Sequence, residues 1–316
     1  MKERQRIKNV IKRLSTYNEE IDLQNPSLLS EDLKYYLQYY KLPFQTVNYH
    51  FGVLKVNGSE TMMQVYAPEK CIGTIYLLHG YFDHVGTLKH LILFLLKKNY
   101  RIVTYDLKGH GLSSGPTAVI QSFEEYVQTF QAVINKTEAL YSEPCSVIAH
   151  STGAAVAVDY LLRSNTHSFN KVILAAPLVR SHLWPLTKVG FYIIKPFLKE
   201  VKRKYRLNSS NKDHQTFIKQ DPLQYDGIPL KWLDALIKWN KKIQIASRSN
   251  TQLFIIQGEK DQTVDWRYNI QFIAKKFPGT ILSLLKEGRH QLFNEREDLR
   301  LEVFHLIHMY LTKELK

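Results

Sequence analysis

The chain has very little cysteine and no long apolar run, and both absences narrow what it can be. Two cysteines among 316 residues are too few for a disulfide framework, so we expect Cys71 and Cys145 to be reduced. A membrane-spanning helix would need about 20 consecutive apolar residues, and no such run occurs. The first residues lack the apolar stretch of a signal peptide. We therefore expect a cytoplasmic protein and leave open a peripheral contact with membranes.

Low-complexity tracts and internal repeats are also missing, which excludes a disordered chain and a solenoid. Acidic residues are fewer than basic ones: the chain has 29 Asp and Glu against 43 Lys and Arg, which gives a net charge of +14. This excess favours anionic partners such as a membrane surface or a phosphate-bearing substrate, and a solvated basic surface explains it equally well. The basic clusters lack the interleaved aromatic residues of nucleic-acid motifs, so we expect no nucleic-acid partner. The oligomeric state stays open.

The hydrophobic pattern predicts an α/β fold with a mostly parallel, twisted sheet and helices on both faces. Two alternating runs flank Asn57-Gly58, a strong signal for an antiparallel hairpin. Six short apolar runs then predict buried parallel strands: GTIYLLHG, YRIVTYD, CSVIAH, KVILAAP, QLFIIQG and TILSLLKE. Helices are expected between them, so the chain reads as a βαβ series.

One long segment interrupts this series. Residues 178–249 are aromatic, basic and mostly helical in pattern, and a connection of this length is usually an inserted functional element. We interpret it as a helical lid. The chain is thus divided into a helical N-terminal extension (1–45), a core in two parts (46–177 and 250–316) and the lid insertion.

The strongest local motif lies where the strand CSVIAH meets an Ala- and Val-rich helix. Residues 149–153 read AHSTG and match the nucleophile elbow G-x-S-x-G, with Ala149 in place of the first Gly. Small residues are needed at both ends because the turn around Ser151 is tight. An ordinary serine in a strand–helix turn would give the same pattern, so the interpretation depends on finding the partners of Ser151.

A serine hydroxyl becomes a nucleophile when a base takes its proton and a third group orients that base. Asp261 and His290 each lie just past the end of a predicted strand, in the chain order that the elbow requires. Parallel strands end at one sheet edge, so we expect a triad of Ser151, Asp261 and His290 there. Asp265 is the main alternative acid, but its position suits the first turn of the next helix. Glu259 is favoured less.

The loop after the first parallel strand is expected to complete the site. The backbone N–H groups of Tyr81 and Thr152 are the predicted oxyanion donors. His84 could reach the pocket or could be an exposed loop histidine, and the remaining histidines near the site are interpreted as structural, namely His79, His110 and His150. The residues expected to bind substrate come from this loop and from the lid: Gly80, Phe82, His84, Trp184 and Phe191.

Four blocks, in order, resemble the α/β-hydrolase superfamily: LLHGYFDHVG, YDLKGHGLSSG, AHSTGA, and GEKDQTVD with EGRHQLFNE. They are most similar to the group of monoacylglycerol lipases, lysophospholipases and serine aminopeptidase-like proteins. This resemblance covers the chain from about Val47 and implies a lid-covered acyl pocket and hydrolysis of a carboxylic ester. Ala149 and Thr152 depart from the residues usual in the group, and neither departure removes a catalytic atom. The block 106–115 is structural in the group.

Two other functions stay open. A peptidase or amidase of the same fold would need an acidic pocket for an amine, and the lid carries Asp213, Asp221 and Asp226. A non-catalytic binding protein of this fold is the other, although all three triad members are present. No metal-ligand cluster or dinucleotide-binding glycine motif occurs, so we expect neither a metal nor a cofactor. The basic charge and the apolar lid favour a lysophospholipid or a monoacylglycerol as substrate.

Overall fold

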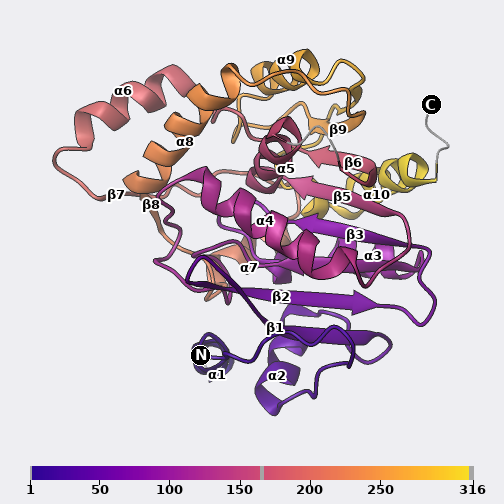
Figure 1. The fold of residues 1–316 in the computed structure, drawn as a ribbon. Helices are drawn as coiled ribbons and strands as arrows, with labels where there is room; N and C mark the ends of the chain where they lie inside the picture. Colours follow the sequence, from indigo (N-terminus) through magenta and orange to yellow (C-terminus); the bar gives the residue numbers. More distant parts are fainter. Residues whose placement is uncertain (1, 164–166, 313–316) are drawn as a thin grey trace.

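The computed structural model describes residues 2–163 and 167–312, and its centre is a sheet of eight strands. The strands lie in the order β1-β2-β4-β3-β5-β6-β9-β10 (Figure 1). Their bounds are β1 (Asn48–Val56), β2 (Ser59–Ala67), β3 (Gly73–Leu78), β4 (Tyr100–Tyr105), β5 (Cys145–His150), β6 (Phe169–Ala175), β9 (Leu253–Gly258) and β10 (Ile281–Leu285).

The first two strands form the predicted hairpin. Val56 pairs with Ser59, and the two residues between them have positive φ, 48° at Asn57 and 75° at Gly58, as a type I′ turn requires. Strand β2 continues antiparallel into β4, and the pairs from β4 to β10 are all parallel. The fold prediction of a mostly parallel sheet preceded by an antiparallel hairpin is therefore confirmed.

Helices cover both faces of the sheet, because successive strand residues point to opposite sides. On β5, Val147 and Ala149 join one apolar cluster and Ile148 joins the other. The first cluster is completed by α4 (Phe123–Glu138), α5 (Thr152–Arg163) and α9 (Trp266–Lys276). The second is completed by α3 (Lys89–Leu96) and α10 (Glu297–Leu311), with the short 3-10 turns η1 (Val85–Leu88) and η2 (Leu292–Asn294) beside them.

The N-terminal segment packs onto the second cluster. It forms α1 (Lys2–Leu14) and α2 (Glu31–Tyr40), and the rings of Tyr36 and Tyr40 are fully buried. An amphipathic helix buries one face in this way when its apolar residues recur every three or four positions. The segment outside the family resemblance is thus part of the core packing.

The insertion between β6 and β9 rises above the carboxyl edge of the sheet, where α6 and α8 project from one end of the molecule (Figure 1). It consists of α6 (Trp184–Ile194), β7 (Glu200–Lys202), α7 (Lys212–Gln220), β8 (Gly227–Pro229) and α8 (Leu230–Gln244), with β7 and β8 paired antiparallel. The mainly helical pattern expected for this segment is observed. Its role as a lid and the division into domains stay predictions.

Candidate active site

The turn at Ser151 has the strained backbone that is typical of a nucleophile elbow. Ser151 has a φ of 51°, a conformation that costs a non-glycine residue about 1–2 kcal/mol. Its N–H donates to the Ala175 carbonyl at 3.0 Å, and its own carbonyl accepts from Ala155 and Leu178. A Cβ at Gly153 would lie 2.6 Å from the His79 carbonyl oxygen, so no other residue fits there without displacing the neighbouring loop.

The structure brings Ser151, His290 and Asp261 together. Nε2 of His290 lies 3.0 Å from the Ser151 hydroxyl oxygen, and Nδ1 lies 2.8 Å from Asp261 Oδ2. All three residues are at least 95% buried, with exposed fractions of 5%, 4% and 4% for Ser151, Asp261 and His290. The arrangement has the order of a nucleophile, a base and an orienting acid. Their catalytic roles are taken up under Proposed function.

Close contact between two loops sets this geometry. A Cβ at Gly258 would lie 2.3 Å from the Gly288 carbonyl oxygen, and the Lys260 N–H donates to that oxygen at 2.9 Å. The loops after β9 and β10 therefore run against one another and carry Asp261 and His290 to the same place. Glu295, fully buried, fixes the second loop by accepting the N–H of Arg289 at 2.7 Å.

The carboxylate of Asp261 is held as an anion. Burial would raise its pKa, but the facing imidazole of His290 and hydrogen bonds from Thr263 and Gln257 lower it below its ordinary value. For His290, burial alone would lower the pKa, and the charge of Asp261 raises it above its ordinary value. The alternative acid Asp265 instead accepts a hydrogen bond from the N–H of Tyr268 at the start of α9.

A second group of buried polar side chains supports His290 and was not predicted. Nε2 of His150 lies 2.9 Å from the His290 carbonyl oxygen, and its Nδ1 lies 3.4 Å from Asp83. Gln291 donates to both oxygens of Asp83 at 3.1 and 3.0 Å. Burial would raise the pKa of Asp83, but these partners lower it below the ordinary value. The one sequence signal was that His150 and Gln291 each adjoin a triad residue.

The predicted oxyanion loop is held by a neutral histidine. Burial lowers the pKa of His79 to about 3, so its imidazole is uncharged at neutral pH. Nε2 accepts the Leu107 N–H at 2.9 Å, which leaves Nδ1 to donate to the Gly80 carbonyl at 2.7 Å. A Cβ at Gly80 would lie 3.0 Å from that of Ser151, so glycine allows the loop to approach the elbow. The oxyanion role of Tyr81 and Thr152 stays a prediction.

A cavity of about 400 Å³ opens beside the triad. Ser151, His290, Tyr81 and Thr152 line it, and so do two predicted substrate-binding residues, Phe82 and Phe191. The remaining wall is largely apolar: Leu178, Leu186, Ile194, Ile228, Leu230, Trp232, Leu233 and Leu236. The cations Arg203, Lys204 and Arg206 also line it, and no Asp or Glu occurs among its described lining residues. It can hold an apolar chain beside a reactive hydroxyl.

Three residues expected at this cavity lie elsewhere. Gly80 lies behind the elbow against His150 and Asp83, and Trp184 is buried in the core at the start of α6. The alternative of an exposed His84 is wrong, because its side chain is fully buried. The structure shows why: Nε2 of His84 lies 2.8 Å from Asp221 of the insertion, a partner 137 residues away.

None of the three carboxylates considered for an amine pocket lines the cavity. Asp221 is paired with His84 and also accepts the Tyr40 hydroxyl at 2.8 Å. Asp226 accepts the Tyr205 hydroxyl, and Asp213 is exposed at the start of α7. The acidic amine pocket that a peptidase would need is therefore not formed by these residues.

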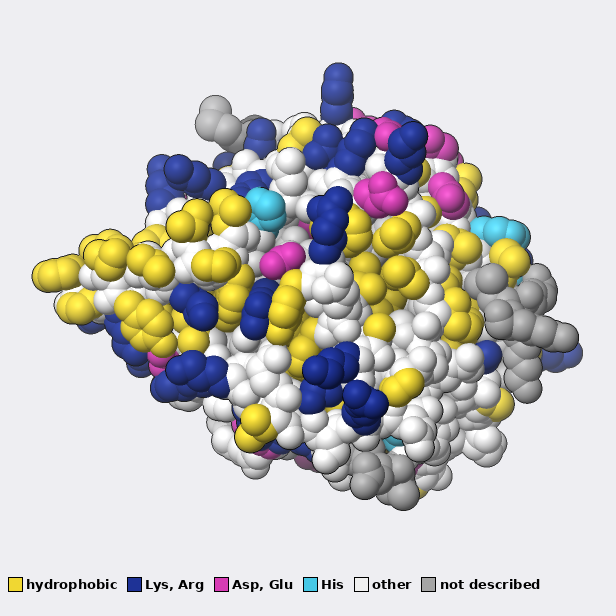
Figure 2. All heavy atoms as spheres, turned by 90° about the horizontal axis from the view of Figure 1, so that it is seen from above, with side chains coloured by type: hydrophobic (Ala, Val, Ile, Leu, Met, Phe, Trp, Pro, Cys, Tyr) yellow, Lys and Arg dark blue, Asp and Glu magenta, His cyan; other side chains and the backbone are white. Residues whose placement is uncertain are grey.

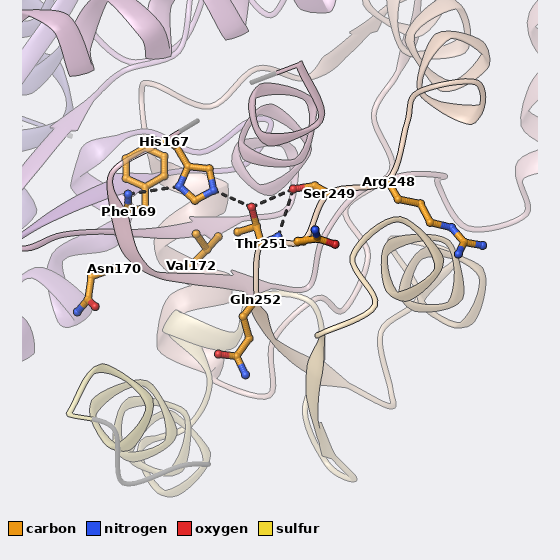
Figure 3. A pocket seen from close by; sticks show the side chains of 9 residues that line it. His167, Phe169, Asn170, Val172, Arg248, Ser249, Thr251 and Gln252 are labelled. Carbon is orange, nitrogen blue, oxygen red and sulfur yellow. Dashed lines mark hydrogen bonds between the residues drawn. The ribbon is translucent and has the colours of Figure 1, made fainter. Parts of the chain in front are cut away.

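A more polar hollow lies at the opposite edge of the sheet, at the amino ends of β6 and β9 (Figure 3). Its side chains bond to one another: His167 Nε2 lies 2.6 Å from the Thr251 hydroxyl, which lies 2.9 Å from that of Ser249. Ser151 follows the carboxyl end of β5, and parallel strands place the two sites at opposite edges. This hollow takes no part in the triad.

Two kinds of feature are absent from residues 2–163 and 167–312. No helix is long and apolar enough to cross a membrane, and no group of three or more His, Cys, Asp or Glu side chains is placed to hold a metal ion. Cys71 and Cys145 are both free, as expected.

Comparison with known proteins gives a family match. The family model described as serine aminopeptidase, S33 matches residues 69–297. Phospholipase YtpA of Bacillus subtilis is 24% identical over 75% of this chain and 95% of its own length. The monoglyceride lipase of Rattus norvegicus is 23% identical over 76% of this chain and 82% of its own.

The fold is shared with a solved structure. A soluble variant of monoglyceride lipase from Saccharomyces cerevisiae, solved with a substrate analog, superimposes with a TM-score of 0.73. The match covers 87% of this chain and 99% of the other at 17% identity. The α/β-hydrolase fold predicted from the sequence is confirmed.

Proposed function

Because the chain belongs to the serine aminopeptidase S33 family, we propose that it is a serine hydrolase that cleaves the carboxylic esters of single-chain lipids. The activity would be that of a lysophospholipase or monoacylglycerol lipase. One observation carries the proposal: an unbroken hydrogen-bonded chain runs from Asp261 through His290 to Ser151 at the wall of an apolar cavity. The names of the relatives, a phospholipase and a monoglyceride lipase, support the same class of substrate.

The proposed reaction has two acyl-transfer steps. His290 takes the proton of Ser151 while the hydroxyl oxygen attacks the ester carbonyl, a transfer that the 3.0 Å separation allows. The bond to the leaving alcohol then breaks, and His290 returns the proton to that alcohol. Water attacks the acyl-enzyme with the same imidazole as base, His290 returns the proton to the Ser151 oxygen as the acyl bond breaks, and the fatty acid leaves. The N–H groups of Tyr81 and Thr152 would stabilise the oxyanion in both steps.

The electrostatics of the site favour this use of His290. The imidazole becomes a cation in each transition state, and the buried carboxylate of Asp261 lies 2.8 Å away to stabilise that charge. Asp261 keeps its negative charge because its pKa lies below the ordinary value. It also fixes the tautomer, since a proton on Nδ1 leaves Nε2 free to accept from Ser151.

The cavity supports an ester lipid over a peptide. Its apolar wall suits an acyl chain, and no carboxylate among the described lining residues is available to bind a substrate amine. This observation argues against the peptidase alternative, although the family is named for an aminopeptidase.

Peripheral contact with a membrane belongs to the same proposal. Helix α6 lines the cavity with one face and presents apolar side chains to solvent with another, including Val189 at 57% and Ile193 at 64% exposure. Phe197 follows at 82%. Figure 2 shows hydrophobic side chains gathered on the protruding end of the molecule, bordered by Lys and Arg. Such a surface can insert into the headgroup region of an anionic bilayer.

A substrate panel tests the enzymatic proposal. Released acid is measured with an acetate ester, a monoacylglycerol and a lysophospholipid as substrates, for the wild type, Ser151→Ala and Ser249→Ala. The last variant removes a hydroxyl in the hollow at the other sheet edge. We expect the long-chain lipids to be cleaved by the wild type and Ser249→Ala only. Wild-type rates in Ser151→Ala would overturn the mechanism, and cleavage of the acetate ester alone would overturn the lipid substrate.

Sedimentation with vesicles tests the membrane contact. The wild type is expected to sediment with vesicles containing anionic phospholipid, and Ile193→Ser with Phe197→Ser is expected to weaken that binding. Equal sedimentation of wild type and double variant would contradict a contact through α6.

A further inference from the structure

The cavity beside Ser151 has a cationic part that the acyl-transfer chemistry does not use. Arg203, Lys204 and Arg206 lie on the strand-like segment that follows β7, and all three line the same cavity as Ser151 and His290. All three belong to the basic stretch KRKYR of the predicted lid segment. General acid–base catalysis by a triad requires no such cations.

Arg203 is held in position by groups without negative charge. Its guanidinium carbon lies 4.0 Å from the centre of the Phe82 ring, next to the predicted oxyanion donor Tyr81. Its Nη1 donates to the side-chain oxygen of Gln224 at 2.9 Å, and Gln224 in turn donates to the Phe82 carbonyl at 2.8 Å. The guanidinium is thus fixed against the oxyanion loop before any substrate arrives.

The three cations have no anionic partner within hydrogen-bond distance. The salt bridges found across residues 2–163 and 167–312 use other Lys and Arg residues. The carboxylate of Asp226 acts on Arg203 from a distance but accepts the hydroxyl of Tyr205. Burial lowers the pKa of Arg203 from its ordinary value, and Asp83 and Asp226 oppose this only from a distance, so the guanidinium has no counter-charge in contact with it. An anion bound here would provide that charge and would be favoured for the same reason.

The two kinds of residue that line the cavity, apolar and cationic, indicate which part of a substrate the cations meet. An ester held at Ser151 has an acyl chain on one side of the carbonyl and an alcohol on the other. The acyl chain is accommodated by the apolar residues of the cavity, so the alcohol is left for the cationic part. A phosphate on that alcohol matches the fork of donors that Arg presents.

We propose that Arg203, Lys204 and Arg206 bind an anionic phosphate headgroup on the alcohol side of a single-chain ester lipid. The site would then prefer anionic lysophospholipids over neutral monoacylglycerols of the same chain length. This inference rests on the proposed ester hydrolase activity and adds its headgroup specificity.

Strand β7 provides a matched control. Val201 and Arg203 line the cavity, and Lys202 between them, the last residue of β7, is not among its lining residues. Lys202 is exposed. The variant Lys202→Gln therefore removes the same charge as Lys204→Gln, from the neighbouring surface and outside the cavity.

The experiment compares oleoyl lysophosphatidic acid with monooleoylglycerol in neutral detergent micelles at fixed ionic strength. The measured quantity is the ratio of kcat/KM for the anionic substrate to that for the neutral one. We expect a ratio of about ten or more in the wild type and Lys202→Gln, and a fall of about tenfold in Lys204→Gln and Arg206→Gln. Arg203→Lys is expected to lower the ratio less than Arg203→Gln, because lysine keeps the positive charge and lacks only the two parallel N–H donors of the guanidinium.

Three results would overturn the inference. One is a wild-type ratio near one with both lipids cleaved, which would leave the proposed hydrolase intact. Another is an equal fall in Lys202→Gln, which would assign the effect to the overall charge of the surface. The third is full inhibition of monooleoylglycerol cleavage by millimolar inorganic phosphate. This result would show that the three cations bind free phosphate and not a lipid headgroup. Failure to cleave either lipid would instead contradict the proposed function.

Discussion

Two buried Asp–His pairs in this molecule have the same spacing and different surroundings. Asp261 and His290 are joined at 2.8 Å, and so are Asp221 and His84. In both pairs the carboxylate raises the pKa of the histidine against the opposing effect of burial. An aspartate that orients a buried histidine therefore does not by itself define an active site.

The difference lies at the other ring nitrogen. Nε2 of His290 faces the hydroxyl of Ser151 on the cavity wall, so a proton can move between them. Nδ1 of His84 accepts the Gly86 N–H at 3.1 Å, which caps the short turn η1 and offers no proton that chemistry could use. The second pair connects the loop after β3 to the insertion, and Tyr40 connects it to the N-terminal segment.

The largest expected effect is on catalysis, and it distinguishes His290 from His84. His290→Ala is expected to lower kcat by about a million-fold, because it removes the base. His84→Ala is expected to lower the kcat of the folded protein by a far smaller factor. Ester hydrolysis measured on variants whose folding is checked by circular dichroism tests this. Similar losses in both variants would contradict the distinction.

Replacing the two acids sharpens the comparison. Asp261→Asn is expected to lower kcat by about 10⁴-fold with the fold retained, because the imidazole adopts the wrong tautomer and its cation loses its counter-charge. Single-turnover kinetics on a soluble ester would measure this. A loss below tenfold would show that Asp261 does not orient His290.

Asp221→Ala is expected to act on stability. It leaves the buried imidazole of His84 without its partner and should lower the free energy of unfolding by about 3–5 kcal/mol. Urea unfolding followed by fluorescence measures the change, and Asp213→Ala, at an exposed position, serves as the control. A change in Asp221→Ala no larger than in the control would contradict the structural role.

Tyr40→Phe tests the third member of that network. Loss of the hydroxyl that donates to Asp221 should lower the free energy of unfolding by about 1–3 kcal/mol. The ring contacts of Tyr40 remain, so the loss should be smaller than in Asp221→Ala. A loss larger than in Asp221→Ala would show that Tyr40 stabilises the fold mainly through its packing and not through this hydrogen bond.

The smallest expected effect is a shift of the pH profile. His290 must be neutral to act as a base, and its pKa lies above the ordinary value, so kcat/KM should fall as the pH drops through that raised pKa. Asp261→Asn removes the charge that raises it and should move this acid limb to lower pH. Asp221→Ala should leave the limb in place. An acid limb unmoved by Asp261→Asn would contradict the assignment.

Much of the fold and the triad could be predicted because their signals are local. Asn57-Gly58 encodes its turn through the two positive φ values, and the small residues around Ser151 encode the elbow. Asp261 and His290 could be located because each follows a recognisable strand. These arguments need only the rule that parallel strands end at one edge.

The parts that sequence reasoning missed depend on long-range contacts. His84 and Asp221 are 137 residues apart, and nothing near either of them indicates the other. His84, which we expected at the substrate pocket, is therefore a buried structural residue. In the same way, the direction of Arg203 toward Phe82 follows from how the insertion folds back, which no local pattern in KRKYR encodes.

The most direct test of the central claim is to locate the nucleophile. The protein is treated with a fluorophosphonate and digested, and the modified peptide is identified by mass spectrometry. The geometry predicts one phosphonyl group on Ser151, lost in Ser151→Ala and strongly slowed in His290→Ala. Modification of another serine, or equal labelling of wild type and Ser151→Ala, would contradict the assignment of this site as a serine hydrolase centre.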